Sequence, residues 1–303
     1  MAITAQDVKA LREMTGVGMM DCKKALAASD GDMDKAVEWL REKGLAASAK
    51  KAGRIAAEGM AYAAVINGVG VVVEVNAETD FVGKNEKFVD FVKGVASTVA
   101  ACDPADLDAL MECKYNNTDL TVLQQQQEMV LVIGENIKVR RFARFADGVS
   151  VPYIHAGGKI GVMVNLEVSG GIDATEIGKD LAMQIAALNP RFLDKGQVTQ
   201  EVLDEEKKIL LAQMANDPKM ASKPDKVKEN IVAGKLNKFY AENCLLQQAF
   251  VKDGDVTVEQ YMNSAAKALG GTVTLKDAVR FEKGEGIEKK QENFAEEIAK
   301  LTK

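Results

Sequence analysis

Histidine, tryptophan and proline are scarce in this chain of 303 residues, which holds one His, one Trp and five Pro. Because His155 is the single histidine, a zinc site built from several histidines is excluded, and a Ser-His-Asp or Cys-His system would have to use it as the base. The patterns G-x-S-x-G and G-x-x-x-x-G-K-[ST] are missing as well. Gly16-Val17-Gly18 follows no predicted strand and lacks the third glycine of a dinucleotide site. Signals for an enzyme are therefore weak.

Long apolar runs and an excess of positive charge are also missing. No run approaches the roughly 18 residues that a membrane span needs, and the start, MAITAQDVKA, lacks the basic and then apolar segments of a secretory signal. A net charge of −6 and a pI near 5.2 argue against a chain-wide phosphate-binding surface, while a local basic patch stays open. With 47% apolar and 28% charged residues, the composition is typical of a soluble protein of two or three domains.

The four cysteines include no C-x-x-C pair and are scattered among apolar neighbours. They are Cys22, Cys102, Cys113 and Cys244. Because no secretory signal is predicted, we expect reduced thiols and a cytoplasmic location.

Residues 1–54 predict three short helices in a compact bundle. Thr4 and Asp7 form a capping-box variant at the start of the first helix. A Gly-Val-Gly string breaks that helix, and apolar residues at helical spacing continue in the two helices that follow. Gly44 is expected at the C-terminal cap of the third helix. The Ala- and Lys-rich residues 45–57 predict a helical or flexible linker.

A hairpin-plus-helix pattern then occurs twice, which indicates a diverged internal repeat. In the first copy, residues 62–75 predict a β-hairpin that turns at Asn67-Gly68, and residues 88–102 predict a helix. In the second copy, residues 151–168 and 174–188 give the same order.

Further elements lie between and after the two copies. Residues 115–135 are helix-prone and residues 137–145 predict a strand. Residues 199–215 and 225–240 predict two helices of an antiparallel hairpin that projects into solvent. The C-terminus predicts a strand over residues 278–282 and then a helix. One face of that helix carries Phe294, Ile298 and Leu301, which would dock on the parent domain or on a partner.

The first copy carries about five more residues than the second between its hairpin and its helix. They fall within residues 77–85, where Thr79-Asp80-Phe81-Val82 places an acid beside an aromatic residue. Loops held by a sheet are favoured places for recognition, and an aromatic side chain there could anchor in a partner's pocket. The alternative is that Phe81 folds back onto its own core.

Two other places are weaker candidates. Met19 and Met20 are adjacent, so a helix cannot bury both on one narrow stripe, and one is expected to face outward or into a groove. Lys23 and Lys24 could pair with acidic groups of a partner. The alternative is a core methionine beside a solvated lysine pair. His155, next to the turn of the second hairpin, is typical of a structural or surface histidine.

Five segments match the motifs of one protein family in order and spacing. They are TGVGMMDCKKAL (residues 15–26), EVNAETDFVGKNEKF (74–88), IGENIKVRR (133–141), HAGGKIGVMV (155–164) and FEKGEGIEK (281–289). Along essentially its whole length the chain resembles bacterial elongation factor Ts, the guanine-nucleotide exchange factor of elongation factor Tu.

The resemblance implies an α+β fold with an N-terminal three-helix, ubiquitin-associated-like bundle, a core of two related hairpin-plus-helix subdomains, a protruding antiparallel helical hairpin and a C-terminal strand–helix module. The expected boundaries are 1–54 for the bundle, 55–148 for core subdomain N, 149–190 with 238–276 for core subdomain C, 191–237 for the helical hairpin and 277–303 for the C-terminal module. The hairpin is a coiled-coil candidate for dimerisation and is the least securely matched segment.

The resemblance also implies a translation factor that is not an enzyme. It would bind elongation factor Tu, both GDP-bound and nucleotide-free, and promote GDP release so that GTP can rebind. In family members the loop enters the partner's nucleotide-binding domain and displaces the groups that hold magnesium. That role carries over to Thr79, Asp80, Phe81 and Val82. Partner-binding roles carry over to Arg12, Met19, Met20, Lys23, Ile133, Gly134 and His155.

The implied protein needs no cofactor or metal of its own, touches neither nucleic acid nor membrane directly, and allows a homodimer in a two-plus-two complex. Two residues depart from the commoner family pattern: Gly83 stands where Ala is frequent, and Val17 replaces a usual Ala. We expect Gly83 to loosen the loop.

Two other function classes stay open. One is a binding module whose N-terminal bundle takes another helix or a ubiquitin-like partner. The other is a hydrolase that uses His155 with a thiol or hydroxyl nucleophile.

Overall fold

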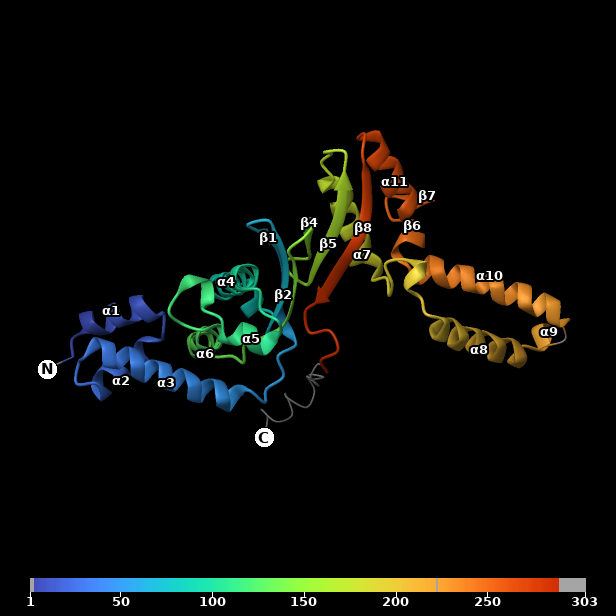
Figure 1. Ribbon diagram of the computed structural model, residues 1–303. Coiled ribbons are helices and arrows are strands. Elements are labelled where there is room, and N and C mark those ends of the chain that lie inside the picture. The colour runs from blue at the N-terminus through green and yellow to red at the C-terminus, as the bar shows by residue number, and fades with distance from the viewer. Residues whose placement is uncertain (1–2, 222, 289–303) are drawn as a thin grey trace. The chain divides into compact units, whose positions relative to one another are not determined.

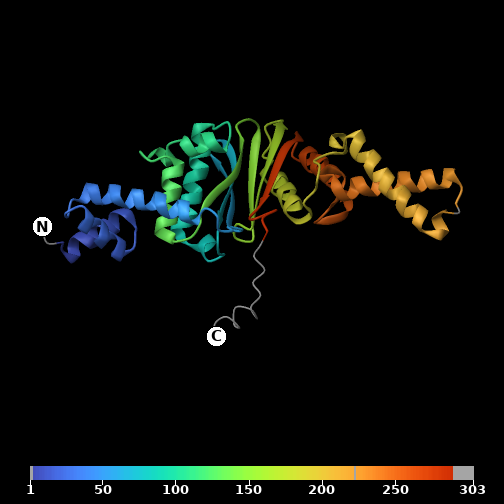
Figure 2. The same cartoon turned by 90° about the horizontal axis from the view of Figure 1, so that it is seen from below.

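A computed structural model describes residues 3–221 and 223–288 (Figures 1 and 2). The chain divides into two compact units. The first comprises the described parts of residues 1–144, 154–161 and 281–303, and the second comprises those of residues 145–153 and 162–280. Helices and small sheets alternate along the chain, which confirms the predicted α+β class.

Three helices open the first unit, as predicted: α1 (Ala5–Thr15), α2 (Met19–Ala28) and α3 (Met33–Lys51). The capping box at the start of α1 is present, with the Thr4 side chain accepting from the Asp7 amide. Gly16 ends α1 in the left-handed conformation, with φ of 67°. The helices enclose a small core of their own, whose fully buried side chains include Leu11, Cys22 and Leu26.

The prediction that Gly44 caps the third helix is wrong, because α3 continues to Lys51. Gly44 is buried in the helix interior, and a Cβ atom there would lie 3.3 Å from the carbonyl oxygen of Gln127 on α6 (Val122–Ile133). The absence of a side chain therefore serves close packing between α3 and α6, and the helix does not stop at this glycine. Part of the predicted linker is thus the last turns of α3.

The first sheet has the strand order β1 (Glu58–Ile66), β2 (Val69–Ala77) and β3 (Lys138–Phe145). The predicted hairpin is confirmed: β1 and β2 are antiparallel, and the turn residues Asn67 and Gly68 have φ of 51° and 83°. These positive values suit the tight turn that the twist of a hairpin favours.

Two helices cover the core of this sheet. The predicted α4 (Glu86–Cys102) and the helix α6 pack with β2 around buried apolar side chains. That cluster includes Val71, Val73, Val75, Phe88, Phe91 and Val95. The short helix α5 (Leu107–Glu112) also contributes to it, through the buried Leu110, and was not predicted.

The second sheet has the order β4 (Val149–His155), β5 (Ile160–Ser169) and β8 (Thr272–Glu282). The helix α7 (Thr175–Leu188) follows β5, so the predicted repeat of strand, strand and helix is confirmed. Three elements of this part were not predicted: β6 (Ala249–Phe250), β7 (Asp253–Thr257) and α11 (Val258–Ala268). Short 3₁₀ helices occupy Val82–Lys84, Tyr115–Asn117, Lys195–Gln197 and Leu245–Gln247.

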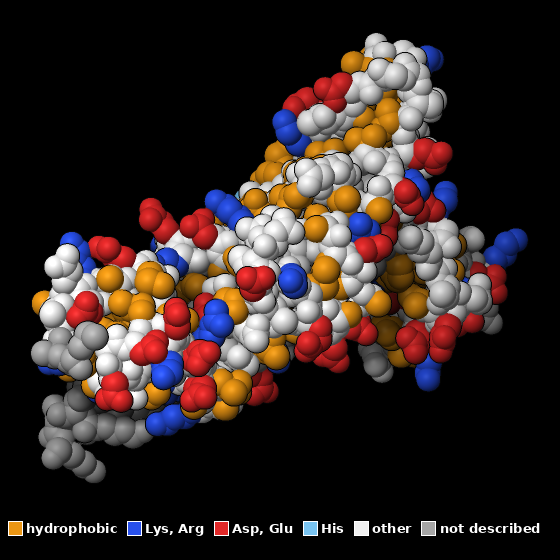
Figure 3. Space-filling model, turned by 60° about the vertical axis from the view of Figure 1, so that its left-hand side comes forward, with side chains coloured by type: hydrophobic (Ala, Val, Ile, Leu, Met, Phe, Trp, Pro, Cys, Tyr) orange, Lys and Arg blue, Asp and Glu red, His pale blue; other side chains and the backbone are white. Residues whose placement is uncertain are grey.

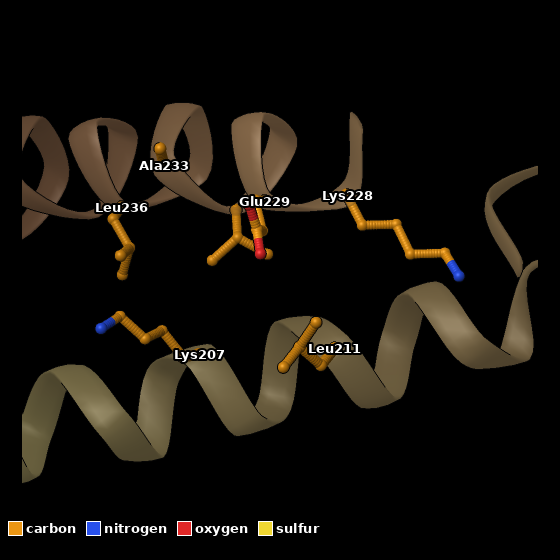
Figure 4. Close-up of a pocket in the computed structure, with 7 residues that line it drawn as sticks. Lys207, Leu211, Lys228, Glu229, Ala233 and Leu236 are labelled. Atoms are coloured by element: carbon orange, nitrogen blue, oxygen red, sulfur yellow. The ribbon is translucent and has the colours of Figure 1, made fainter. Parts of the chain in front are cut away.

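The predicted helical hairpin consists of α8 (Gln200–Asn216) and α10 (Asp225–Asn243), joined through the short helix α9 (Pro218–Ala221). The two long helices run alongside each other and bury Leu210, Met214 and Val232 between them (Figure 1). A largely apolar groove of about 480 Å³ lies in the same interface. Leu211 faces it from α8 and Leu236 from α10 (Figure 4).

Some sequence expectations fall beyond what the structure describes. The predicted C-terminal helix with Phe294, Ile298 and Leu301 lies outside the described residues. The five-segment division of the chain stays a prediction. Among the residues that are described, none of the helices is long and apolar enough to cross a membrane.

Candidate protein-binding surface

The segment between β2 and α4 presents one aromatic side chain to solvent. Phe81 is 80% exposed, the largest value among the exposed large apolar side chains of the described residues. The next residue, Val82, is buried in the core of the first sheet and begins a 3₁₀ turn. Asn85 then caps α4 by accepting from the amides of Lys87 and Phe88. The alternative that Phe81 folds back onto the core is therefore excluded.

Gly83 has a different role from the loosening that we expected. It is buried, and a Cβ atom at this position would lie 2.8 Å from the carbonyl oxygen of Gly59 on β1. That distance is too short for a side-chain carbon. The glycine therefore lets the end of the loop approach the strand closely, which holds the loop down instead of freeing it.

The beginning of the loop is held by Glu135, in the turn after α6. One carboxylate oxygen of Glu135 accepts the backbone N–H groups of Glu78 and Thr79, each at 3.0 Å. The other oxygen accepts the Thr79 hydroxyl at 2.7 Å. Three donors thus converge on a single carboxylate. Two motifs that lie apart in the sequence are joined here: the Thr79–Val82 loop, and the IGENIKVRR segment, whose first four residues form the Ile133–Asn136 turn.

The contact is reciprocal, because Glu78 reaches back to the same turn. Its carboxylate accepts the backbone N–H of Asn136 at 2.6 Å and pairs with Arg54 at 3.4 Å. The Asn136 amide donates to the Arg54 carbonyl at 2.8 Å. Burial and the neighbouring Arg54 lower the pKa of Lys51, against the opposing influence of Glu78 and Glu135. Arg54, which follows the end of α3, therefore belongs to the same cluster.

Sequence reasoning did not assign roles to Glu78, Glu135, Asn136 or Arg54. Glu78 and Glu135 lie inside matched motifs. Neither has an oppositely charged residue three or four positions away on a helix, or two positions away on a strand, that would have predicted an interaction. Their contacts join parts of the chain that are distant in sequence. The available signal in the sequence was the position of Glu78, an acidic residue directly before the predicted recognition loop.

The N-terminal bundle exposes a methionine surface. Met19 and Met20 are 55% and 66% exposed, so both face outward, where the sequence predicted only one. The reason is that α2 turns Cys22, Ala25 and Leu26 into the bundle core, which leaves its first turn outside. Arg12 and Lys23 are exposed as well. The alternative of a core methionine is thereby excluded.

One hydrogen bond links this bundle to the start of α4. The Lys87 ammonium donates to the carbonyl oxygen of Gly16 at 3.2 Å. Lys87 lies in the first turn of α4, directly after the loop, and Gly16 lies between α1 and α2. Arg41 of α3 also pairs with Glu128 of α6 at 3.5 Å. The bundle is thus tied to the elements that carry the loop and the Ile133–Asn136 turn.

His155 ends β4 and is exposed. Its carbonyl oxygen accepts the backbone N–H groups of Gly158 and Lys159, which closes the turn. The Gly158 carbonyl in turn accepts the Ala61 N–H of β1 at 2.8 Å. The His155 turn is therefore docked on the same strand that pairs with β2.

Three of the four cysteines are poorly suited to nucleophilic chemistry. All four are free thiols. Burial raises the pKa of Cys244 to about 11, and burial with the Cys102 side chain raises the pKa of Cys113 to about 11. Burial also raises the pKa of Cys22. Thiols of such pKa carry little thiolate near neutral pH, which argues against a thiol hydrolase.

Taken together, these features make the first unit the candidate for contact with a protein partner. It offers an exposed aromatic side chain beside an acid, two exposed methionines and exposed basic residues, all in the first unit. Acidic and basic side chains are interspersed on the face drawn in Figure 3. In the part of the chain that the structure describes, no three His, Cys, Asp or Glu side chains gather as a metal site would require.

Comparison with known proteins gives one consistent family. A family model described as "Elongation factor TS" matches residues 78–285. The chain is 48% identical to Elongation factor Ts of Syntrophotalea carbinolica over 307 residues, which covers 100% of both proteins. It is 50% identical to Elongation factor Ts of Clostridium perfringens strain SM101 over 305 residues, 99% of each. With that of Trichlorobacter lovleyi it shares 50% identity over 309 residues, 99% of this chain and 98% of the relative.

Proposed function

The chain belongs to the elongation factor Ts family, and on that premise we propose that it releases GDP from elongation factor Tu by inserting its Thr79–Val82 loop. The family has a role in translation elongation as the nucleotide exchange factor of elongation factor Tu. In the proposed mechanism the loop enters the partner's nucleotide-binding domain and displaces groups that hold magnesium, after which GTP rebinds. The observation that supports it is the exposed Phe81, presented beside Asp80 on a loop anchored at both ends.

This mechanism needs no catalytic acid or base. Magnesium bridges the phosphate oxygens of a nucleotide to the protein that binds it. A loop that favours the magnesium-free arrangement of the partner lowers its nucleotide affinity, and nucleotide lowers the affinity for the loop by the same factor. A hundredfold effect needs about 2.7 kcal/mol of coupling. Burying an aromatic side chain contributes about 1.5–3 kcal/mol, so Phe81 could account for much of it.

Other contacts are needed for a larger effect. We propose that Arg12, Met19, Met20 and Lys23 of the N-terminal bundle bind the same partner domain. Flexible, polarisable methionine side chains adapt to partner surfaces, which suits Met19 and Met20. Ile133 and Gly134, held beside the loop base, would contact the partner near its phosphate-binding loop, and His155 would make a further contact.

The test is release of a fluorescent GDP analogue from elongation factor Tu, followed by stopped flow with increasing factor. We expect Phe81→Ala to slow release by about 10- to 100-fold at a fixed factor concentration, since it removes most of an aromatic side chain that the proposed complex would bury. Leu188→Ala is a matched control, because Leu188 is 49% exposed at the end of α7 and has no assigned role. Release at the unmodified rate with Phe81→Ala would rule out the inserted aromatic group.

The homodimer in a two-plus-two complex also stays a proposal. The helical hairpin offers exposed apolar side chains for it, with Ile209 and Leu211 of α8 about half exposed. These are the positions at which substitutions would test self-association, by sedimentation velocity of the free protein.

A further inference from the structure

We propose that Glu135 is a positioning residue for exchange: it fixes the first half of the Thr79–Val82 loop, so that Phe81 is presented to the partner in one conformation. This inference rests on the proposed function, since it concerns the same loop. Glu135 itself lies in the turn after α6 and is not a contact residue in the proposed mechanism. Its role would be to hold the loop ready before the partner arrives.

The geometry leaves very little of the loop free. Glu135 holds the amides of Glu78 and Thr79 and the Thr79 hydroxyl, with donor–acceptor distances of 2.7–3.0 Å. On the other side, Val82 is buried in the core. Between these two anchors stand only Asp80 and Phe81. A charged acceptor shared by three donors makes a stronger anchor than a neutral one, because charge-assisted hydrogen bonds are shorter and stronger.

The position of Glu135 is itself determined by the turn that carries it. Gly134 ends α6 in the left-handed conformation, with φ of 88°, which a glycine adopts without strain. The Asn136 N–H then donates to Glu78, so the turn and the loop base hold each other in register. Because Ile133 and Gly134 belong to this turn, the same cluster aligns two proposed contact regions as one surface.

The cluster also includes the end of the N-terminal bundle. Arg54 pairs with Glu78, and its carbonyl accepts from Asn136, so the residues that follow α3 are fixed to the loop base. The Glu78 carboxylate thus meets Arg54 and the Asn136 N–H, while the Glu135 carboxylate meets the donors of Glu78 and Thr79. Loss of the Glu135 side chain would keep the contacts of the Glu78 carboxylate with Arg54 and Asn136. Only the backbone N–H groups of Glu78 and Thr79 and the Thr79 hydroxyl would lose their acceptor.

The experiment measures GDP release across a range of factor concentrations for Glu135→Ala and Glu135→Gln. A loosened loop spends less time in the competent conformation, which lowers the apparent affinity by that fraction. We therefore expect Glu135→Ala to raise the half-saturating concentration by roughly tenfold, with a smaller change in the rate at saturation. Glu135→Gln keeps one carbonyl acceptor and should recover part of the loss. Glu112→Ala, an exposed acid at the end of α5, is the control.

A second comparison separates positioning from a general structural role. In the Phe81→Ala background, Glu135→Ala should have a much smaller effect on exchange than in the unmodified protein, because the aromatic side chain that it positions is gone. Effects of the two substitutions that simply add would overturn the inference. Circular dichroism and thermal unfolding of each variant show whether it is folded. If Glu135→Ala does not fold, the same comparison is made with Glu135→Gln.

Hydrogen exchange in the free protein tests the anchor without any partner. The amides of Glu78 and Thr79 should exchange at least about tenfold faster in Glu135→Ala, while the Phe88 amide, capped by Asn85, stays unchanged. If Phe81→Ala alone leaves release unaffected, the proposed function fails, and this measurement still decides whether Glu135 holds the loop. Unchanged exchange at both loop amides would overturn the inference.

Discussion

Phe81, in the segment that leads from β2 into α4, and Phe88, in the first turn of α4, lie in opposite environments. Phe88 is fully buried against the first sheet, while Phe81 is 80% exposed. Burial of the Phe88 side chain contributes to the stability of the fold, whereas the apolar surface of Phe81 remains available for a partner. An exposed aromatic residue on an anchored loop lowers the ordering cost of binding, since few side-chain and backbone angles remain to be fixed.

Glu74 is a charged residue whose burial is fully compensated. It is buried on β2, and its carboxylate accepts from Arg140 at 2.9 Å, Arg141 at 2.5 Å and the Gly284 N–H at 2.8 Å. The Asn76 amide donates to it as well, at 3.0 Å. These contacts join β2, β3 and the segment after β8. They give a structural role to the FEKGEGIEK motif, which the sequence could only match to the family.

Stability should depend on pH through Glu74. Burial alone raises its pKa, but the hydrogen bonds from Arg140, Gly284, Asn76 and Arg141 outweigh burial and hold the pKa below the ordinary glutamate value. A folded-state pKa below the unfolded one stabilises the protein above the unfolded value, near about 4.3, and this contribution is lost as pH falls through the folded pKa. We expect Glu74→Gln to flatten the acid side of a Tm–pH curve. Glu74→Ala should lower the free energy of unfolding by about 3–5 kcal/mol at pH 7.

Differential scanning calorimetry from pH 7 to pH 3 measures both effects. Glu112→Ala, at an exposed acid, should leave the curve as in the unmodified protein. An acid limb that keeps its slope in Glu74→Gln would show that other carboxylates govern acid unfolding.

At the scale of elements, two glycines inside helices show why local propensity is an incomplete guide. Gly44 of α3 packs against the backbone of α6, where a Cβ atom at this position would lie only 3.3 Å from the Gln127 carbonyl oxygen. Gly234 of α10 has open space around it, with no heavy atom within 4 Å of the corresponding position among the described residues. Glycine is therefore favoured by close packing in α3, whereas in α10 the packing does not call for it.

The two glycines should therefore respond oppositely to substitution. Gly234→Ala should raise the free energy of unfolding of the second unit by about 0.5–1 kcal/mol, because alanine is the better helix former. Gly44→Val should lower the stability of the first unit by about 1–3 kcal/mol, since the side chain forces α3 away from α6. Urea unfolding followed by circular dichroism measures both. A stabilised Gly44→Val variant would mean that α3 and α6 do not pack this closely in solution.

The elements that sequence predicted well are those whose signals are local. The first hairpin was predicted because Asn67-Gly68 supplies the positive φ that its turn needs, and α4 because its apolar period is clear. The length of α3 was not predictable, since the reason for Gly44 lies on α6. The short helix α5 was missed because six residues give little periodicity. The helix α11 was missed although the Thr257–Gln260 capping box at its start is a local signal. The same limit applies to the site: the loop was found, but the Glu78–Glu135 cluster depends on contacts between distant segments.

At the scale of the whole molecule, the N-terminal bundle decides between an exchange factor and a general binding module. The bundle has its own core, against which Leu131 and Val132 of α6 also pack. Its links to the rest of the first unit include the packing of α3 on α6, the Arg41–Glu128 pair and the Lys87–Gly16 hydrogen bond. Removal of residues 1–50 eliminates these contacts but leaves Arg54, the loop and Glu135 in the chain.

We therefore expect the truncated protein to keep a folded core and to need a higher concentration for half-maximal GDP release. In the proposed mechanism, methionine and basic contacts from the bundle would contribute affinity, whereas the loop would displace magnesium. The rate at saturation should therefore fall less than the affinity. A module that uses the bundle for some other helical or ubiquitin-like partner predicts unchanged affinity for elongation factor Tu after truncation. Titration of the truncated and full-length proteins against nucleotide-free elongation factor Tu by calorimetry distinguishes the two, and the −6 net charge makes a fixed ionic strength essential to that comparison.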